Sequence, residues 1–367
     1  MTQGYTLYGS EVSYFSGKVR AYLRYKRIPF AEFLNTPDAY RKVILPRVGW
    51  PVIPVVITPE DETLQDSSEI IDALEARFPE APVYPDGVKQ RLAALLLEVY
   101  ADEWLKIPAM HYRWNRNYDF AVAEFGKMSA PGQPVEVQRE AGLKISKPFA
   151  GALPFLGVTP KTEEAIEQSY EALLGELDKH FAVYEFLFGT RPSIGDFGLV
   201  GPLYAHQYRD PASGELMKAI APNVARWVER MMKPPYPKGG EFLARDEVPE
   251  TIIPVLARMM REMIPVLVST AHHLQKWAEA NHDARAGSEV PRAIGTHVFS
   301  LGDAKENRAI FPFDLWMIQR PLDLIAGLEE DDKLRAADLL RQSGGETLME
   351  FPSFPRLTRH NFKLTLA

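Results

Sequence analysis

The chain has 367 residues, of which 46% are hydrophobic, so it can bury a sizeable core and form more than one domain. Its formal net charge is −7 and it contains no long basic block, which argues against nucleic acid as a partner. The chain has no cysteine, which excludes a disulfide framework, a zinc–thiolate site and a thiol nucleophile. Any sulfur chemistry must therefore come from a bound thiol.

No stretch of the sequence predicts a membrane span. The most apolar candidate, residues 252–268, is interrupted by Arg258, Arg261 and Glu262. The first nine residues lack the basic and apolar regions of a secretory signal. We therefore expect a cytoplasmic protein without a membrane partner.

The beginning of the chain predicts a strand, a helix and a second strand. Residues 5–8 alternate in polarity, residues 13–20 enter a helix, and residues 28–33 form another apolar run. A strand, a helix and a strand in this order favour a parallel βαβ unit.

Two more short strands and a helix follow. The β-branched run at residues 55–57 predicts a buried strand, and residues 63–64 return the chain as its partner. A helix begins after Asp66-Ser67, either of which can cap it. A βαβ unit followed by two strands and a helix is the thioredoxin-like arrangement, so we expect an α+β fold.

This second unit carries a possible binding site. A proline at the head of a strand donates no ladder hydrogen bond, and a cis bond before Pro54 would leave the backbone of Ile53 free for a peptide-like ligand. The positive end of the helix after Asp66-Ser67 suits a carboxylate. An ordinary hairpin followed by a capped helix explains the same residues, and local pattern alone favours that simpler interpretation.

The sequence VIPVV, followed after a short turn by LQDSSEII, resembles the glutathione-binding domain of glutathione transferases. The resemblance implies that Pro54 is a cis proline and that the backbone of Ile53 pairs with the cysteinyl part of glutathione. It also implies that Asp66 and Ser67 hold the γ-glutamyl end. The family more often has Glu where Asp66 stands.

Ser13 is the candidate for chemistry. A hydroxyl that donates to a thiol sulfur stabilises the thiolate and lowers the pKa of the thiol. From spacing alone, Ser13 or Ser16 is simply a helix N-cap. The run SYFSGKVR resembles the entry motif of serine- and cysteine-type bacterial transferases, which implies that Ser13 is catalytic and that Phe15 contacts glutathione. Tyr8 and Tyr14 remain alternative hydroxyl donors.

One position departs from the family pattern. Many members place a lysine for the glycyl carboxylate just before the valine–proline pair, where this chain has Pro51 and Val52. Four residues of the preceding segment are open as substitutes: Arg41, Lys42, Arg47 and Trp50.

The remainder of the chain predicts helices. A helical pattern begins at Val88, residues 126–160 are expected to be loop with short helical pieces, and a long helix is expected from Thr159-Pro160. Ser193 to Asp196 predicts a capping box at the start of another helix.

A segment rich in proline and glycine at residues 233–240 predicts a boundary. Beyond it we expect a helix over residues 248–282 bent at two prolines, a hairpin that pairs residues 296–300 with 309–311, and closing helices at 314–328 and 331–342. The histidines of this part lack metal-ligand spacing, so no metal site is predicted.

Together these features predict a thioredoxin-like domain over residues 1–85, an all-helical domain over 88–232 and a mostly helical extension over 241–367. The resemblance implies a cytoplasmic glutathione transferase of the detoxification type, with glutathione as co-substrate, an apolar electrophile as partner and a homodimeric assembly. The alternatives are a non-catalytic glutathione-binding or interaction protein, and a glutathione-dependent isomerase or ether-cleaving enzyme.

Overall fold

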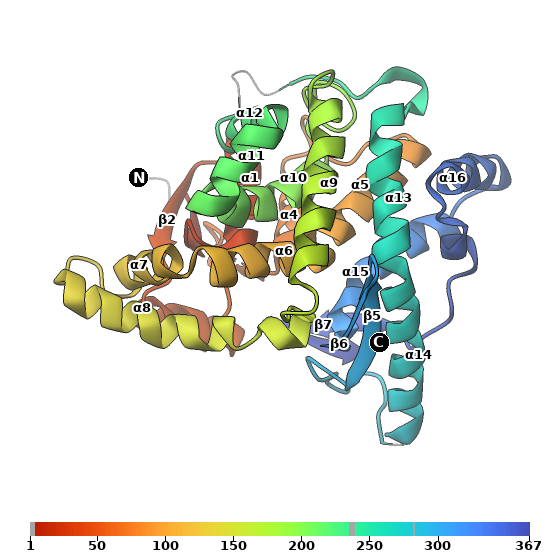
Figure 1. The fold of residues 1–367 in the computed structure, drawn as a ribbon. Coiled ribbons are helices and arrows are strands. Elements are labelled where there is room, and N and C mark those ends of the chain that lie inside the picture. The colour runs from red at the N-terminus through yellow and green to blue at the C-terminus, as the bar shows by residue number, and fades with distance from the viewer. Residues whose placement is uncertain (1–3, 235–238, 282) are drawn as a thin grey trace.

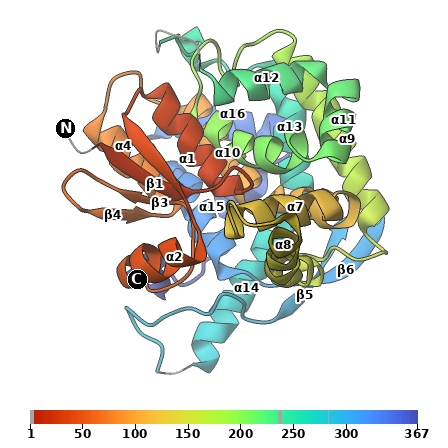
Figure 2. The same cartoon turned by 90° about the vertical axis from the view of Figure 1, so that its left-hand side faces the viewer.

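The computed structural model describes residues 4–234, 239–281 and 283–367 (Figure 1). The part of the predicted boundary at 235–238 and the last residue of the helix predicted over 248–282 lie outside the described residues. A small sheet with its helices lies on one side of a larger helical body (Figure 2). The α+β fold class is as predicted, whereas the domain boundaries stay predictions.

The N-terminal unit contains a four-stranded sheet in the order β2-β1-β3-β4. Strand β1 is parallel to β2 and antiparallel to β3, and β4 is antiparallel to β3. The elements in chain order are β1 (Tyr5–Gly9), α1 (Tyr14–Tyr25), β2 (Phe30–Leu34), α2 (Pro37–Ala39), α3 (Leu45–Val48), β3 (Val55–Ile57), β4 (Thr63–Gln65) and α4 (Ser67–Arg77). This is the βαβ-ββα order that the sequence predicts.

The two faces of the sheet bury different clusters. Leu7 points to the face where α1 and α4 pack, in the main core of the molecule. Because successive strand residues point to opposite faces, Tyr8 belongs to a second cluster around Ile44, Val48 and Val55. The site described below lies at one end of this sheet.

The next part is helical, as predicted. Its helices are α5 (Val88–Val99), α6 (Lys106–His111), α7 (Tyr118–Ser129), α8 (Val135–Ala150), α9 (Glu163–Phe181), α10 (Ile194–Pro202), α11 (Pro211–Ile220) and α12 (Pro222–Met232). Helix α10 is buried over its whole length and begins with the predicted capping box of Ser193 and Asp196. The carboxylate of Asp196 also accepts hydrogen bonds from the N–H of Leu187 and the indole of Trp227, so this cap ties three segments together.

The loop predicted over residues 126–160 is wrong, because α7 and α8 form a helical hairpin there. The two glycines within its helices, Gly126 and Gly142, allow close packing rather than a turn. A Cβ on Gly126 would lie 2.1 Å from the carbonyl oxygen of Gln138, and one on Gly142 would lie 2.1 Å from that of Val122. The predicted start of the following helix at Pro160 is also wrong, since α9 begins at Glu163.

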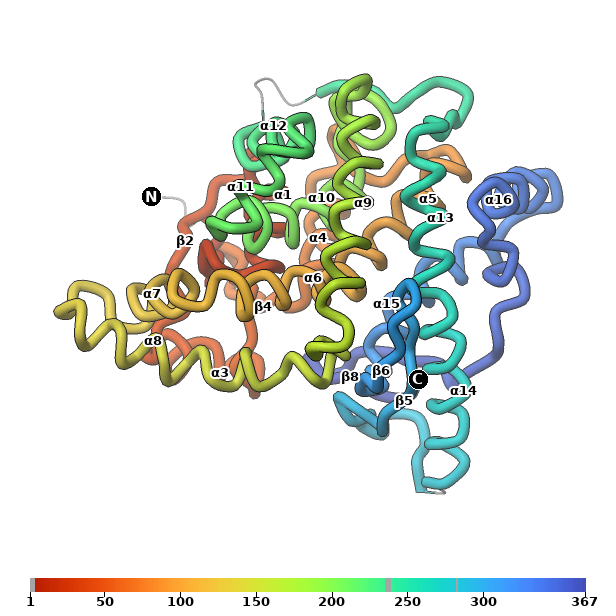
Figure 3. Tube along the Cα trace, viewed as in Figure 1, coloured from red at the N-terminus to blue at the C-terminus, as the bar shows by residue number. Residues whose placement is uncertain are grey.

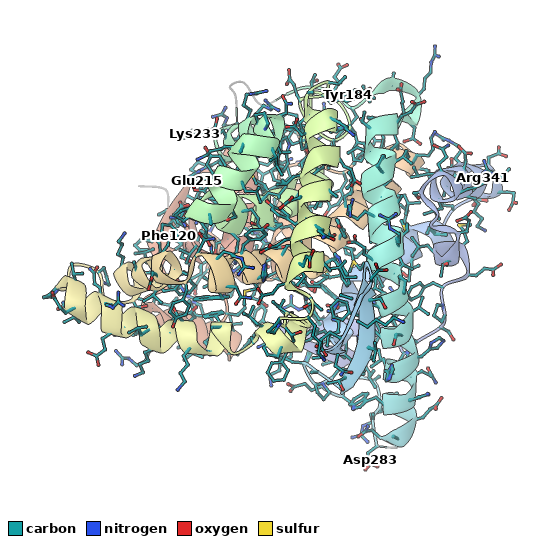
Figure 4. The ribbon with its side chains drawn as sticks, in the orientation of Figure 1. Phe120, Tyr184, Glu215, Lys233, Asp283 and Arg341 are labelled. Atoms are coloured by element: carbon teal, nitrogen blue, oxygen red, sulfur yellow. The ribbon has the colours of Figure 1, made fainter. Side chains whose placement is uncertain are left out.

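The extension contributes α13 (Ile253–Glu262), α14 (Ile264–Ala280), β5 (Thr296–Leu301), β6 (Ala304–Ala309), α15 (Pro312–Ala326), α16 (Glu330–Ser343), β7 (Leu357–His360) and β8 (Lys363–Leu366). Figure 3 shows α13 beside α9, against which it packs. Figure 4 places Phe120 of α7 and Arg341 of α16 at opposite sides of the molecule.

Two expectations about the extension need correction, and one element was not foreseen. The single bent helix is two helices, because Pro254 and Pro265 each stand in a first turn, where a missing N–H costs nothing. The predicted hairpin exists, but β6 begins at Ala304 because the chain turns within two residues. The β7–β8 hairpin was not predicted. Within the described residues, no helix is both long and apolar enough to cross a bilayer.

Candidate functional site

The register of the sheet brings the predicted site residues to one edge. Tyr8 at the end of β1 lies opposite Val55, and Val55 lies opposite Gln65 at the end of β4. The segment before β3, the start of α4 and the short loop from β1 to Ser13 therefore meet at this edge. The structure thus places Ser13, Ile53-Pro54 and Asp66-Ser67 around the same end of the sheet.

The segment before β3 offers a free backbone. The Ile53–Pro54 peptide bond is cis, as the resemblance implies. Among the hydrogen bonds of the described residues, none involves the N–H or the carbonyl of Ile53. Ile53 itself is half-buried and Pro54 is buried. This backbone is available to pair with the main chain of a peptide-like ligand.

Asp66 caps α4 in an unusual conformation. Its backbone has φ 76° and ψ 133°, a conformation that residues other than glycine rarely adopt. Its carboxylate oxygen Oδ1 accepts from the N–H of Ser68 at 2.8 Å and that of Glu69 at 3.4 Å. Such conformations gather at ligand sites.

The neighbouring Ser67 is 3% exposed, and its hydroxyl makes no hydrogen bond within the described part of the chain. It stands at the first position of α4, where the N–H groups and the helix dipole favour an anion. A ligand carboxylate at this point would be held by the helix N-terminus and by the hydroxyl together.

Ser13 is the N-cap of α1, which is the simpler of its two predicted roles. Its Oγ accepts a hydrogen bond from the N–H of Ser16 at 3.2 Å. A hydroxyl that accepts one hydrogen bond still has its own proton to donate. Capping the helix and donating to a thiol sulfur are therefore compatible.

The two tyrosine alternatives differ sharply. The hydroxyl of Tyr14 is buried and donates to the carbonyl of Ala101, and burial raises its pKa well above the ordinary value. The Tyr14 hydroxyl therefore links α1 to the segment that follows α5 and has no proton free for a ligand. Tyr8 stacks on Phe33 with ring centroids 5.8 Å apart, and it remains an alternative donor. Phe15 is half-buried and packs against the ring of Tyr14.

Comparison with known families decides the assignment. Residues 7–82 match the glutathione S-transferase N-terminal domain, and residues 158–230 match the glutathione S-transferase C-terminal domain. The chain thus matches both domains of the glutathione S-transferase family. Among curated proteins, no relative matches the chain. The expected function is accordingly related to glutathione.

Solved transferases with a similar fold cover about two thirds of this chain. One is a glutathione S-transferase from Rhodospirillum rubrum F11, with 16% identity and a TM-score of 0.41, covering 67% of this chain and 96% of its own. Another, from Methylobacterium radiotolerans in complex with glutathione sulfonate, has 21% identity and a TM-score of 0.40 over 66% and 98%. The beta-etherase LigF from Sphingobium sp. strain SYK-6 has 17% identity and a TM-score of 0.47 over 64% and 96%.

A buried charge network lies beneath the candidate site. The Lys18 ammonium on α1 is fully buried and donates to Glu98 at 2.7 Å, Asp102 at 2.5 Å and Ser68 at 3.0 Å. Burial opposes the charge, but the two carboxylates outweigh it and hold the pKa of Lys18 above its ordinary value. Arg320 of the extension reaches the other oxygen of Glu98 at 2.5 Å.

This network joins both helices whose N-termini form the site, α1 and α4, to α5. Sequence analysis missed it. The signal was present, because Glu98 and Asp102 stand one turn apart within a mostly apolar helical stretch. A charge at a buried helical position needs a partner, and Lys18 of α1 is that partner.

Four residues were considered as replacements for the lysine that many family members use to bind the glycyl carboxylate, and their surroundings differ. Arg41 and Lys42 are both paired with Asp38 on the surface. Arg47 is turned toward Asp61 in the β3–β4 turn. The indole N–H of Trp50 is buried and has no partner in the described structure, which leaves it available to a ligand carboxylate. No group of three or more potential metal ligands gathers within the described residues.

Proposed function

We propose that this protein binds glutathione at the sheet edge and activates the glutathione thiol for attack on an electrophilic small molecule. The observation that carries the proposal is the unpaired backbone of Ile53 at the same edge as the N-terminus of α4. The Ile53 backbone would pair with the cysteinyl part, while Asp66 and Ser67 would hold the γ-glutamyl end. Phe15 would contact the same ligand from α1.

The chemistry follows from one hydroxyl. Since the chain has no cysteine, the nucleophilic sulfur must arrive with the ligand. Ser13 would donate a hydrogen bond to that sulfur and favour the thiolate over the thiol. The thiol proton would leave to solvent, the sulfur would form a bond to the electrophilic carbon, and the leaving group would depart with its electron pair. Holding the two reactants together would supply much of the rate.

The proposal also covers the second substrate, the location and the role of the protein. We propose that an apolar electrophile is held against the helical domain, that the protein is cytoplasmic and that it acts in detoxification. A non-catalytic glutathione-binding protein is the second candidate, and contacts of the C-terminal hairpin with β4 and α4 favour it. A panel of electrophiles separates the two, because glutathione binding without turnover on any of them would support the second candidate.

Replacing Ser13 by alanine tests the thiol activation. We expect Ser13→Ala to fold and to bind glutathione, because its capping bond to Ser16 is a long one at the edge of the site. The bound thiol should titrate at higher pH, and turnover near neutral pH should fall about tenfold, as one pKa unit implies. Absorbance of the bound thiolate against pH gives the first quantity and initial rates give the second. Tyr8→Phe is the matched control, and a thiol shift in that variant alone would move the role to Tyr8.

Assembly is a separate expectation. We propose a two-fold homodimer that joins the N-terminal domain of one chain to the helical domain of another. The extension already covers part of this surface, since Arg320 of α15 pairs with Asp72 of α4 and Glu98 of α5. The dimer must therefore use the remaining exposed area. Light scattering at micromolar concentration should give twice the mass of one chain, and a monomer would contradict the proposal.

A further inference from the structure

The C-terminal β7–β8 hairpin reaches back to the proposed glutathione site. Arg359 on β7 donates to the carbonyl of Gln65 at 3.0 Å and also to the side chains of Gln65 and Glu69. It donates further to the carbonyl of Phe362 at 3.2 Å. The Arg359 side chain is 4% exposed, so these contacts occupy it. The guanidinium therefore fixes the hairpin onto the residue before Asp66 and onto the first turn of α4.

A second contact reaches the other half of the site. The ring of Phe362 packs on the cluster of Ile44, Val48 and Val55, in which Trp50 and Ile53 also take part. Residues 359–363, which we call the hairpin tip, thus contact both the cluster against which Ile53 packs and the start of α4. These are the two surfaces that would bind the cysteinyl and γ-glutamyl parts of glutathione.

In the turn of the hairpin, Phe362 occupies a position that a bulky residue rarely takes. His360 pairs with Lys363, so Asn361 and Phe362 form a two-residue turn. Their φ angles of 49° and 62° are both positive, as in a type I′ turn. Asparagine tolerates this conformation, but the second position strongly favours glycine, and a bulky residue there is unusual. The contact that the aromatic ring makes with the N-terminal domain explains its presence.

The base of the hairpin is anchored in the extension. The side chain of Gln319 donates to the carbonyl of Leu357 at 2.9 Å and accepts from its N–H at 2.8 Å. Strand β8 also pairs with the segment before β5, through the N–H of Val290 and the carbonyl of Leu364 at 2.9 Å. The tip can therefore leave the site while the base keeps its place.

We propose that the hairpin tip is an autoinhibitory cover, held by Arg359 and Phe362, which competes with glutathione for the Ile53 segment and the first turn of α4. This inference rests on the proposed function of that site. A ligand that binds only when the cover is open has an apparent dissociation constant raised by the inverse of the open fraction. The extension would then regulate access of glutathione.

Two variants release the tip in different ways. Arg359→Ala removes the contacts with Gln65 and Glu69. Phe362→Gly removes the ring but gives the turn the residue it favours, so the hairpin itself should persist. His360→Ala is the matched control, because His360 is exposed and lies between the two. Titration calorimetry with glutathione on the full chain gives the affinities, and hydrogen exchange of residues 357–366 reports the release.

Both release variants should bind glutathione about tenfold more tightly than the unmodified chain, as expected when a site closed nine-tenths of the time is opened. Exchange at the hairpin tip should accelerate in both, and His360→Ala should change neither quantity. Glutathione should also accelerate exchange at the tip of the unmodified chain.

The outcomes separate the cover from the function beneath it. Unchanged or weaker affinity in both variants, with faster exchange at the tip, would overturn the cover and leave the glutathione site standing. If neither the unmodified chain nor either variant binds glutathione, the proposed function fails and the cover fails with it. Tighter binding without faster exchange at the tip would also overturn the cover, since the tip would not have moved.

Discussion

Lys18→Met should lower the free energy of unfolding by about 3–5 kcal/mol, because it leaves buried carboxylates without their cation. The Lys18 ammonium and the Glu98 carboxylate are both fully buried, and Asp102 is nearly so. Methionine fills much of the same volume, so the loss comes from charge rather than from a cavity. Urea unfolding followed by circular dichroism gives the value.

Lys127→Met is the matched control for this measurement. Lys127 is 64% exposed and pairs with Glu124 one turn earlier on α7. Exposed pairs of this kind contribute about 0–1 kcal/mol. If the two variants lost similar stability, Lys18 would not hold the network together. A Lys18→Met chain as stable as the unmodified protein would show that Arg320 alone satisfies Glu98.

The network also bears on the site. Lys18 and Ser68 connect α1 to α4, and the N-termini of these two helices supply Ser13 and Ser67. Removing the ammonium should therefore let the N-termini of α1 and α4 move relative to each other, and with them the two surfaces that would hold the ligand. A buried polar network restricts the arrangement of the elements that it joins, and in this one Oδ1 of Asp102 has no hydrogen-bond partner within the described residues.

Local signals account for what the sequence predicted. The strand after Pro54 and the capped helix after Asp66 are each specified by neighbours within a few residues, and both lie where they were expected. The capping box at Asp196 is another local signal, whereas the cis bond at Pro54 was implied by the family resemblance. Local pattern therefore predicted the fold class, and the resemblance pointed to the edge of the sheet as the candidate site.

Long-range contacts account for the features that the sequence did not predict. Arg359 and Gln65 are 294 residues apart, so no pattern could pair them. The β7–β8 hairpin lacks a glycine in its turn, and this removed the usual hairpin signal. The glycines of α7 and α8 looked like loop residues, although they serve the close approach of two helices. The sequence alone does not distinguish a glycine that packing requires from a glycine that a turn requires.

Ser67→Ala should raise the dissociation constant for glutathione at least tenfold, since a hydrogen bond to a charged group contributes about 1.5–3 kcal/mol. The Ser67 hydroxyl has no partner in the described structure, so its removal breaks no bond of the free protein. Stability should therefore change little. Titration calorimetry and thermal unfolding measure the two quantities on the same sample.

Ser68→Ala provides the contrasting variant, because the next serine is equally buried but already bonded. Its Oγ donates to Glu98 at 2.8 Å and accepts from Lys18 at 3.0 Å. Ser68→Ala should lose stability and keep its glutathione affinity, the reverse of Ser67→Ala. Affinity lost in Ser68→Ala and kept in Ser67→Ala would place the γ-glutamyl group away from the start of α4, because only Ser67 has a hydroxyl left to bind it.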